Sequence, residues 1–137
     1  MKLDKAVLEK LYRKYNKRQY VHPDPLEFLY RYRAVRDREI VALIASSMAF
    51  GRVLQILKSL SFVFGKMGDS PYRFVMMSSK FHLRKAFRGF RHRFVGDKEL
   101  ICFLTAIRNV LKKYGSLNNC FLADATADNN IFHFLDS

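Results

Sequence analysis

The chain has 137 residues, of which half are apolar, and 25 Lys and Arg against 12 Asp and Glu give it a formal net charge of +13. A chain of this length and apolar content can bury a core of its own, which excludes a wholly disordered protein. All 25 basic residues lie within residues 1–113, whereas residues 114–137 contain three Asp and no Lys or Arg. This distribution favours an anionic partner such as nucleic acid. The alternative is a solvated cationic surface that binds nothing specific.

The sequence does not predict export or a membrane span. Its first residues, MKLDKAVLEK, carry charges where a signal peptide has its apolar segment. Basic residues also interrupt the longest apolar run before it reaches membrane-spanning length. Cys102 and Cys120 are too few and too far apart for a disulfide framework or a zinc knuckle. We therefore expect a cytoplasmic, reduced protein in which Cys102 is a small core residue and Cys120 is partly exposed.

Two helices are expected near the start of the chain. Residues 4–15 form an amphipathic pattern that Asp4 can cap, with an inner stripe of Val7, Leu8, Leu11 and Tyr15. A second, short helix begins at Asp24-Pro25-Leu26-Glu27. There the aspartate can accept from free amides, the proline suits the first helical position, and the glutamate completes a capping-box-like arrangement.

The centre of the fold is predicted to be a helical hairpin at about residues 39–49 and 51–66, joined near Phe50-Gly51. The first helix is apolar on nearly all sides, and we expect Asp37 to cap it. The second has a single apolar stripe with polar residues opposite. A helix with no polar face belongs in the middle of a small domain, with other helices packed around it. We therefore predict an all-α fold.

Further helices follow. Gly68 is a C-cap, Ser70-Pro71 opens a short helix, and Gly96-Asp97 starts a long amphipathic helix that Gly115 ends. A turn or short helix is expected at 117–123 and a terminal helix from Asp128. Near the end, four apolar residues need cover, namely Ile131, Phe132, Phe134 and Leu135. We expect residues 1–137 to form one compact helical domain that is incomplete at its C-terminus.

The segment of residues 80–94, KFHLRKAFRGFRHRF, alternates cations with aromatic rings and contains no acid. Cations neutralise phosphates and aromatic faces stack on unpaired bases, so this mixture suits nucleic acid. The candidate phosphate contacts are Arg52, Arg84, Lys85, Arg88, Arg91 and Arg93. The alternative is an ordinary amphipathic helix with solvated arginines. For Phe81, Phe87 and Phe94, burial in such a helix is the favoured interpretation.

No catalytic, cofactor or metal site is predicted. The histidines at 22, 82, 92 and 133 are isolated from one another and from carboxylates at ligand spacing. Ser46-Ser47 lies in an apolar helix, where small residues serve close packing. Asp37 and Glu39 are interpreted as caps and helix-dipole partners rather than an acid–base pair.

Three blocks resemble an uncharacterised bacterial family, domain of unknown function 2400, over residues 12–122. They are YNKRQYVHPDPLEFLYRY, DREIVALIASSMAFGRVLQILKS and RFVGDKELICFLTAIRNVLKKYGSLNNCF. Longer members carry a block similar to part of the helix-hairpin-helix DNA glycosylases. That weaker likeness implies a helical fold with Ser46, Ser47, Phe50 and Gly51 near a cleft that faces nucleic acid. The chain has no LPGVG-like hairpin and no catalytic Lys after one, so the resemblance implies no activity for it.

Three hypotheses follow. The first is a basic helical domain that binds nucleic acid, DNA rather than RNA, through the six candidate cations without sequence specificity. The second is the N-terminal part of a glycosylase-like enzyme whose catalytic half is absent. The third is a protein-interaction module that docks through residues 131–135.

Overall fold

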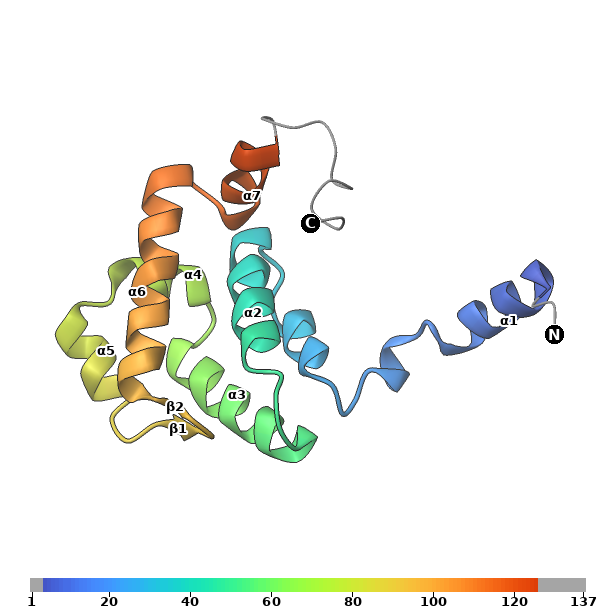
Figure 1. Ribbon diagram of the computed structural model, residues 1–137, viewed down its shortest axis with the longest axis horizontal. Helices are drawn as coiled ribbons and strands as arrows, with labels where there is room; N and C mark the ends of the chain where they lie inside the picture. The colour runs from blue at the N-terminus through green and yellow to red at the C-terminus, as the bar shows by residue number, and fades with distance from the viewer. Residues whose placement is uncertain (1–3, 126–137) are drawn as a thin grey trace, which may run out of the picture.

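The computed structural model describes residues 4–125, and helices dominate them (Figure 1). The α-helices are α1 (Lys5–Tyr15), α2 (Val35–Ser47), α3 (Val53–Met67), α4 (Pro71–Met77), α5 (Lys80–Ala86), α6 (Asp97–Tyr114) and α7 (Leu117–Ala125). Two 3-10 helices, η1 (Arg18–Tyr20) and η2 (Pro25–Arg31), connect α1 to α2. Strands β1 (Arg91–His92) and β2 (Val95–Gly96) form a small antiparallel hairpin before α6. The predicted all-α class is therefore confirmed, with this hairpin as an addition.

Helix α2 lies at the centre, as its sequence predicts. It packs against η2, α4 and α7, and Ile40, Val41 and Ile44 are fully buried. Helix α3 completes the predicted helical hairpin and packs against η2, α4 and β1. Phe28 of η2 and Phe64 of α3 join these elements with their ring centroids 5.2 Å apart. One expectation is corrected, since Ser46 and Ser47 are exposed at the end of α2 rather than closely packed.

Asp37 does not cap α2, because the helix already begins at Val35. Its carboxylate is buried and accepts hydrogen bonds from Ser70 Oγ at 3.0 Å and from the Tyr72 backbone N–H at 2.8 Å. Ser70 in turn caps α4 by accepting from the Arg73 N–H. Asp37 therefore joins the start of α4 to the central helix, and it places a negative charge at an α-helix N-terminus.

Helix α6 starts and ends as the sequence predicts. The Glu99 side chain accepts from the Gly96 N–H at 2.9 Å, and Gly115 ends the helix with a φ of 80°. Within α6, Arg108 donates from Nε to the Val75 carbonyl oxygen at 2.6 Å and also to the Ser78 carbonyl oxygen. These carbonyls lie at the end of α4, so the guanidinium satisfies acceptors that the helix leaves free.

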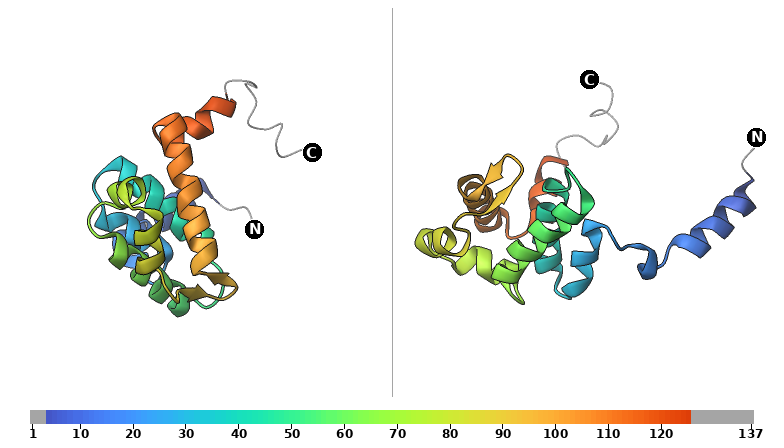
Figure 2. Two further views of the ribbon diagram at one scale, coloured as in Figure 1. Left: turned by 90° about the vertical axis from the view of Figure 1, so that its left-hand side faces the viewer. Right: turned by 90° about the horizontal axis from the view of Figure 1, so that it is seen from below.

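Helix α1 departs most from expectation. Asp4 caps it as predicted, by accepting from the Ala6 N–H at 3.2 Å. The supposed inner stripe, however, is 44–51% exposed, and no residue of α1 is buried in the described chain. Figure 1 and the right-hand view of Figure 2 show α1 projecting away from the other helices. The apolar stripe of α1 therefore packs against no other element of the described residues, although its pattern predicts that it would.

Smaller expectations have mixed outcomes. Asp24 caps η2 by accepting from the Leu26 N–H at 2.8 Å, as predicted. Glu27 does not complete a capping box, because its carboxylate lies 2.6 Å from His22 Nδ1. Cys102 is exposed on α6 instead of buried, whereas Cys120 is partly exposed as expected. Helix α7 confirms the short helix near 117–123, while the expected terminal helix and residues 131–135 lie outside the described residues.

Candidate nucleic-acid interface

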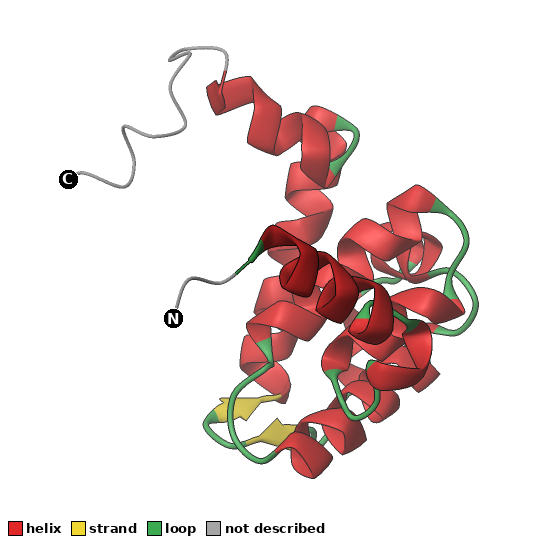
Figure 3. Ribbon diagram, turned by 90° about the vertical axis from the view of Figure 1, so that its right-hand side faces the viewer, coloured by secondary structure: helices red, strands yellow, loops and turns green. Residues whose placement is uncertain are grey.

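The basic segment of residues 80–94 is not one helix, so the expectation of a single amphipathic helix is wrong, while the alternative that its arginines are only solvated stays open. Helix α5 ends at Ala86, and Gly89 turns the chain with a φ of 75°. The Asp97 carboxylate holds this turn by accepting from the Gly89 N–H at 3.2 Å. The hairpin then pairs Arg91 with Gly96 and His92 with Val95. Figure 3, with strands in yellow, shows the hairpin at one end of the helical body.

The broken helix changes which phenylalanines are buried. Phe87 is fully buried as expected, and Phe90 is buried with it. Phe81 and Phe94 are instead 76% and 74% exposed. Burial is therefore confirmed for one of the three rings and wrong for the other two.

His92 fastens the hairpin to the helices. It is 1% exposed, and its Nε2 lies 3.2 Å from the carbonyl oxygen of Phe50, in the α2–α3 loop. A carbonyl only accepts, so Nε2 carries the hydrogen. His92 Nδ1 lies 3.0 Å from Ser59 Oγ of α3, and Gln55 donates to the same hydroxyl at 3.4 Å. This chain of hydrogen bonds fixes the hairpin against both the loop and α3.

Phe50 and Gly51, which the glycosylase likeness places near a cleft that faces nucleic acid, lie against the β-hairpin. The Phe50 and Phe94 rings are nearly parallel, with centroids 4.9 Å apart and an interplanar angle of 9°. Gly51 has a φ of 104°, and a Cβ placed on it would lie 3.0 Å from Arg93 Cδ. The loop therefore needs glycine at this position, both for its backbone conformation and for the close approach of Arg93. Ser46 Oγ instead donates within its own helix, to the Leu43 carbonyl oxygen at 3.1 Å.

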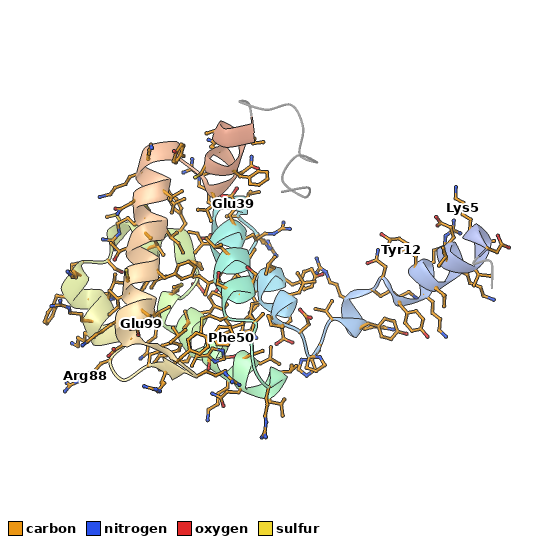
Figure 4. All side chains as sticks on the ribbon, viewed as in Figure 1. Lys5, Tyr12, Glu39, Phe50, Arg88 and Glu99 are labelled. Atoms are coloured by element: carbon orange, nitrogen blue, oxygen red, sulfur yellow. The ribbon has the colours of Figure 1, made fainter. Side chains whose placement is uncertain are left out.

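The six candidate cations are all exposed, and together they are here called the basic face. It consists of Arg52, Arg84, Lys85, Arg88, Arg91 and Arg93. Arg84 and Arg88 line an open cleft of about 950 Å³ between α5 and α6, together with Lys80, Lys98, Arg108 and one acid, Asp97. Arg88 and Arg91 also border a smaller hollow of about 250 Å³ beside α3. Figure 4 shows Arg88 and Phe50 in the lower half of the helical body, with Glu39 toward its upper end.

None of the six cations forms an ion pair with a carboxylate of the described residues. The ion pairs there involve Glu27, which pairs with His22 and Arg31. The nearest acids of the hairpin, Asp97 and Glu99, accept from backbone amides instead. Among the described residues, the cations of the basic face therefore have no carboxylate in direct ion-pair contact.

Other kinds of site find no support in residues 4–125. No group of three or more His, Cys, Asp or Glu side chains lies close enough there to hold a metal ion. His92, which the sequence shows only as an isolated histidine, is a structural anchor. None of the described helices is both long enough and apolar enough to span a bilayer.

The fold and the basic face together define a mainly helical protein with a concentrated cationic surface. The pattern of a family described as "Protein of unknown function (DUF2400)" matches residues 24–136, and the chain belongs to that family. The match begins at Asp24, after α1. No curated protein and no solved structure matches the chain. The resemblance to helix-hairpin-helix DNA glycosylases stays a prediction.

Proposed function

We propose that the chain binds nucleic acid through the basic face. The observation that carries this proposal is that cations on three elements are exposed and none forms an ion pair with a carboxylate of the described residues. Arg52 comes from the α2–α3 loop, Arg84 from α5, and Arg91 from the hairpin. Phosphate contacts of this kind supply affinity and position the ligand, but they do not read its sequence.

The face offers more than a general positive charge. Arg93 lies against Gly51, the residue before Arg52, so two cations from distant parts of the sequence come close together. The stacked rings of Phe50 and Phe94 lie at the same place, and Phe94 is exposed. Arg88 belongs to both the cleft between α5 and α6 and the hollow beside α3, so it connects the two ends of the surface. A polyanionic strand can cross all three elements and contact a cation on each. DNA is the first ligand to test.

The test compares two triple variants of equal charge change. The first replaces Arg52, Arg88 and Arg91 of the basic face with Glu. The matched control replaces Arg33, Arg38 and Arg73, which are also exposed but lie on and around α2 and α4. Binding of labelled DNA is measured by fluorescence anisotropy across a range of salt concentrations. Circular dichroism checks that both variants remain helical.

We expect the basic-face variant to bind far more weakly than the control. Each lost phosphate contact lowers the slope of log affinity against log salt by about one, so three should lower it by about three. The control should keep most of the affinity and of the slope. Equal losses in both variants would mean that only net charge matters, and an unchanged basic-face variant would place the interface elsewhere.

The other two hypotheses stay predictions. A glycosylase-like activity needs catalytic residues from sequence that this chain does not contain. Docking through residues 131–135 concerns residues outside those that the structure describes.

A further inference from the structure

We infer that Phe94 is a stacking platform for an unpaired base, so that the basic face prefers single-stranded or locally unpaired nucleic acid to a regular duplex. The inference rests on the proposed function, because it names the ligand class of the same face. The juxtaposition that carries it is an exposed, supported aromatic ring among cations that have no carboxylate partner.

One face of the Phe94 ring is open. The other lies against Phe50 in a parallel, stacked arrangement with a centroid separation of 4.9 Å. Phe94 nevertheless remains 74% exposed, so the ring is covered on one side only. Apolar rings this exposed cost free energy in water, and stacking against a planar partner removes that cost.

The platform is held in place before any ligand arrives. Phe50 packs against the buried His92 ring, with centroids 4.8 Å apart, and its carbonyl oxygen accepts from His92 Nε2. His92 is fastened in turn to Ser59 of α3. Because the ring beneath Phe94 is fixed, binding does not have to order it, and less of the stacking free energy is lost to conformational entropy.

Two exposed cations lie close to the platform. Arg93 precedes Phe94 and lies against Gly51, and Arg52 follows that glycine. A base stacked on Phe94 would leave its phosphates near these guanidiniums. Aromatic platforms beside cationic grooves are the general means of binding single strands without sequence preference. In a regular duplex, both faces of each internal base are already stacked on neighbours, so the platform has no free base face to contact.

Phe81 offers a matched control. It is 76% exposed on α5, close to the value for Phe94, but it has no ring partner among the described residues. The experiment compares Phe94→Ala with Phe81→Ala, using a labelled single-stranded oligothymidylate of about 16 nucleotides and a blunt duplex of the same length. Phe94→Tyr, which keeps the ring, and Phe94→Leu, which keeps an apolar contact to Phe50, complete the set.

We expect the wild-type chain to bind the single strand more tightly than the duplex. Phe94→Ala should weaken single-strand binding by about 5- to 150-fold, the range that stacking of one base supports. Phe94→Leu should show a similar loss, Phe94→Tyr should restore binding, and Phe81→Ala should change affinity less than about twofold. Duplex binding should be insensitive to all four variants.

A spectroscopic measurement tests stacking directly. An oligonucleotide that carries 2-aminopurine should lose fluorescence on binding the wild-type chain, because stacking quenches this base, and the loss should disappear with Phe94→Ala. Equal affinity for both ligands with no effect of Phe94→Ala would overturn the inference while leaving the proposed function intact. Equal weakening of both ligands would also overturn it, since Phe94 would then only shape the hairpin. Absence of binding to either ligand would instead refute the proposed function.

Discussion

Asp37 carries a carboxylate inside the protein, and its two hydrogen bonds explain how this is tolerated. Only 8% of the residue is exposed, and both bonds come from the first turn of α4. Nearby, burial raises the pKa of Tyr32, with Arg31 opposing the change and Asp37 and Asp69 adding to it. The Tyr32 phenol therefore stays protonated and donates to the Gly68 carbonyl oxygen at 3.3 Å. Together these side chains join η2, α2 and the α3–α4 turn.

Replacing Asp37 should therefore destabilise the fold. We expect Asp37→Ala to lower the free energy of unfolding by about 2–3 kcal/mol. The substitution removes two hydrogen bonds to a charged group and leaves the Ser70 hydroxyl and the Tyr72 N–H without their acceptor. Asp37→Asn keeps an acceptor oxygen and should cost less. Urea unfolding measures both. Asp69→Asn, at an exposed position of the same turn, should stay within about 0.5 kcal/mol of wild type. A similar small effect for Asp37→Ala would contradict the structural role given to this carboxylate.

The position of Asp37 in the sequence could not reveal this role. An acid just before an apolar helical run is a typical cap, but its partners, Ser70 and Tyr72, come more than thirty residues later. His92 is a similar case, because its partners Phe50 and Ser59 are more than thirty residues away and the residues around His92 give no sign of them. Helix ends whose capping partners lie within a few residues are predicted correctly, among them those at Asp4, Ser70 and Gly115. Contacts made by the folded chain require the structure.

The β-hairpin shows how an error in one predicted element changes the expected positions of several side chains. Five of the six candidate cations follow from the alternation of cations and rings in residues 80–94, and the sixth, Arg52, from its place after Gly51; all six are exposed. The exposure of Phe94 was missed because helical periodicity was assumed through residue 94. The turn at Gly89 and the strands end that periodicity. Phe94 then falls beside Phe50 on the surface rather than in the core.

Helix α1 makes a clear prediction about stability. Because none of its residues is buried, removing residues 1–16 should change the free energy of unfolding by less than about 0.5 kcal/mol. The exposed ring contact between Tyr15 and Tyr20 is the main interaction lost. Ile107→Ala on α6 provides the sensitivity control, since truncating this buried side chain should cost about 2–5 kcal/mol. A truncation as costly as Ile107→Ala would mean that α1 packs on the body in solution.

The acids of the chain mostly serve its backbone. Most carboxylates of the described residues bind backbone amides rather than cations. Those that accept from a backbone N–H are Asp4, Asp24, Asp37, Glu39, Asp97 and Glu99. They complete helix ends and turns, and the basic residues still outnumber the acids of the chain by thirteen. The folded protein therefore keeps a strong mutual repulsion among its cations.

That repulsion predicts opposite effects of salt on stability and on binding. Raising NaCl from about 10 mM to about 150 mM shortens the Debye length from about 30 Å to about 8 Å, which screens repulsion in the free protein. We expect its Tm to rise by about 2–4 °C, as for a stabilisation of about 1 kcal/mol. Over the same range, affinity for nucleic acid should fall steeply, because the counterions that binding releases gain less entropy when they enter a more concentrated salt solution.

The two triple variants separate these effects. Each replaces three Arg with Glu and lowers the formal charge from +13 to +7, since three changes of two units remove six. Both should therefore gain less Tm from salt than wild type, as followed by thermal unfolding with circular dichroism. Only the basic-face variant should also lose nucleic-acid affinity. A wild-type Tm that falls with added salt would show that attractive ion pairs outweigh repulsion, and would contradict a surface whose cations lack carboxylate partners.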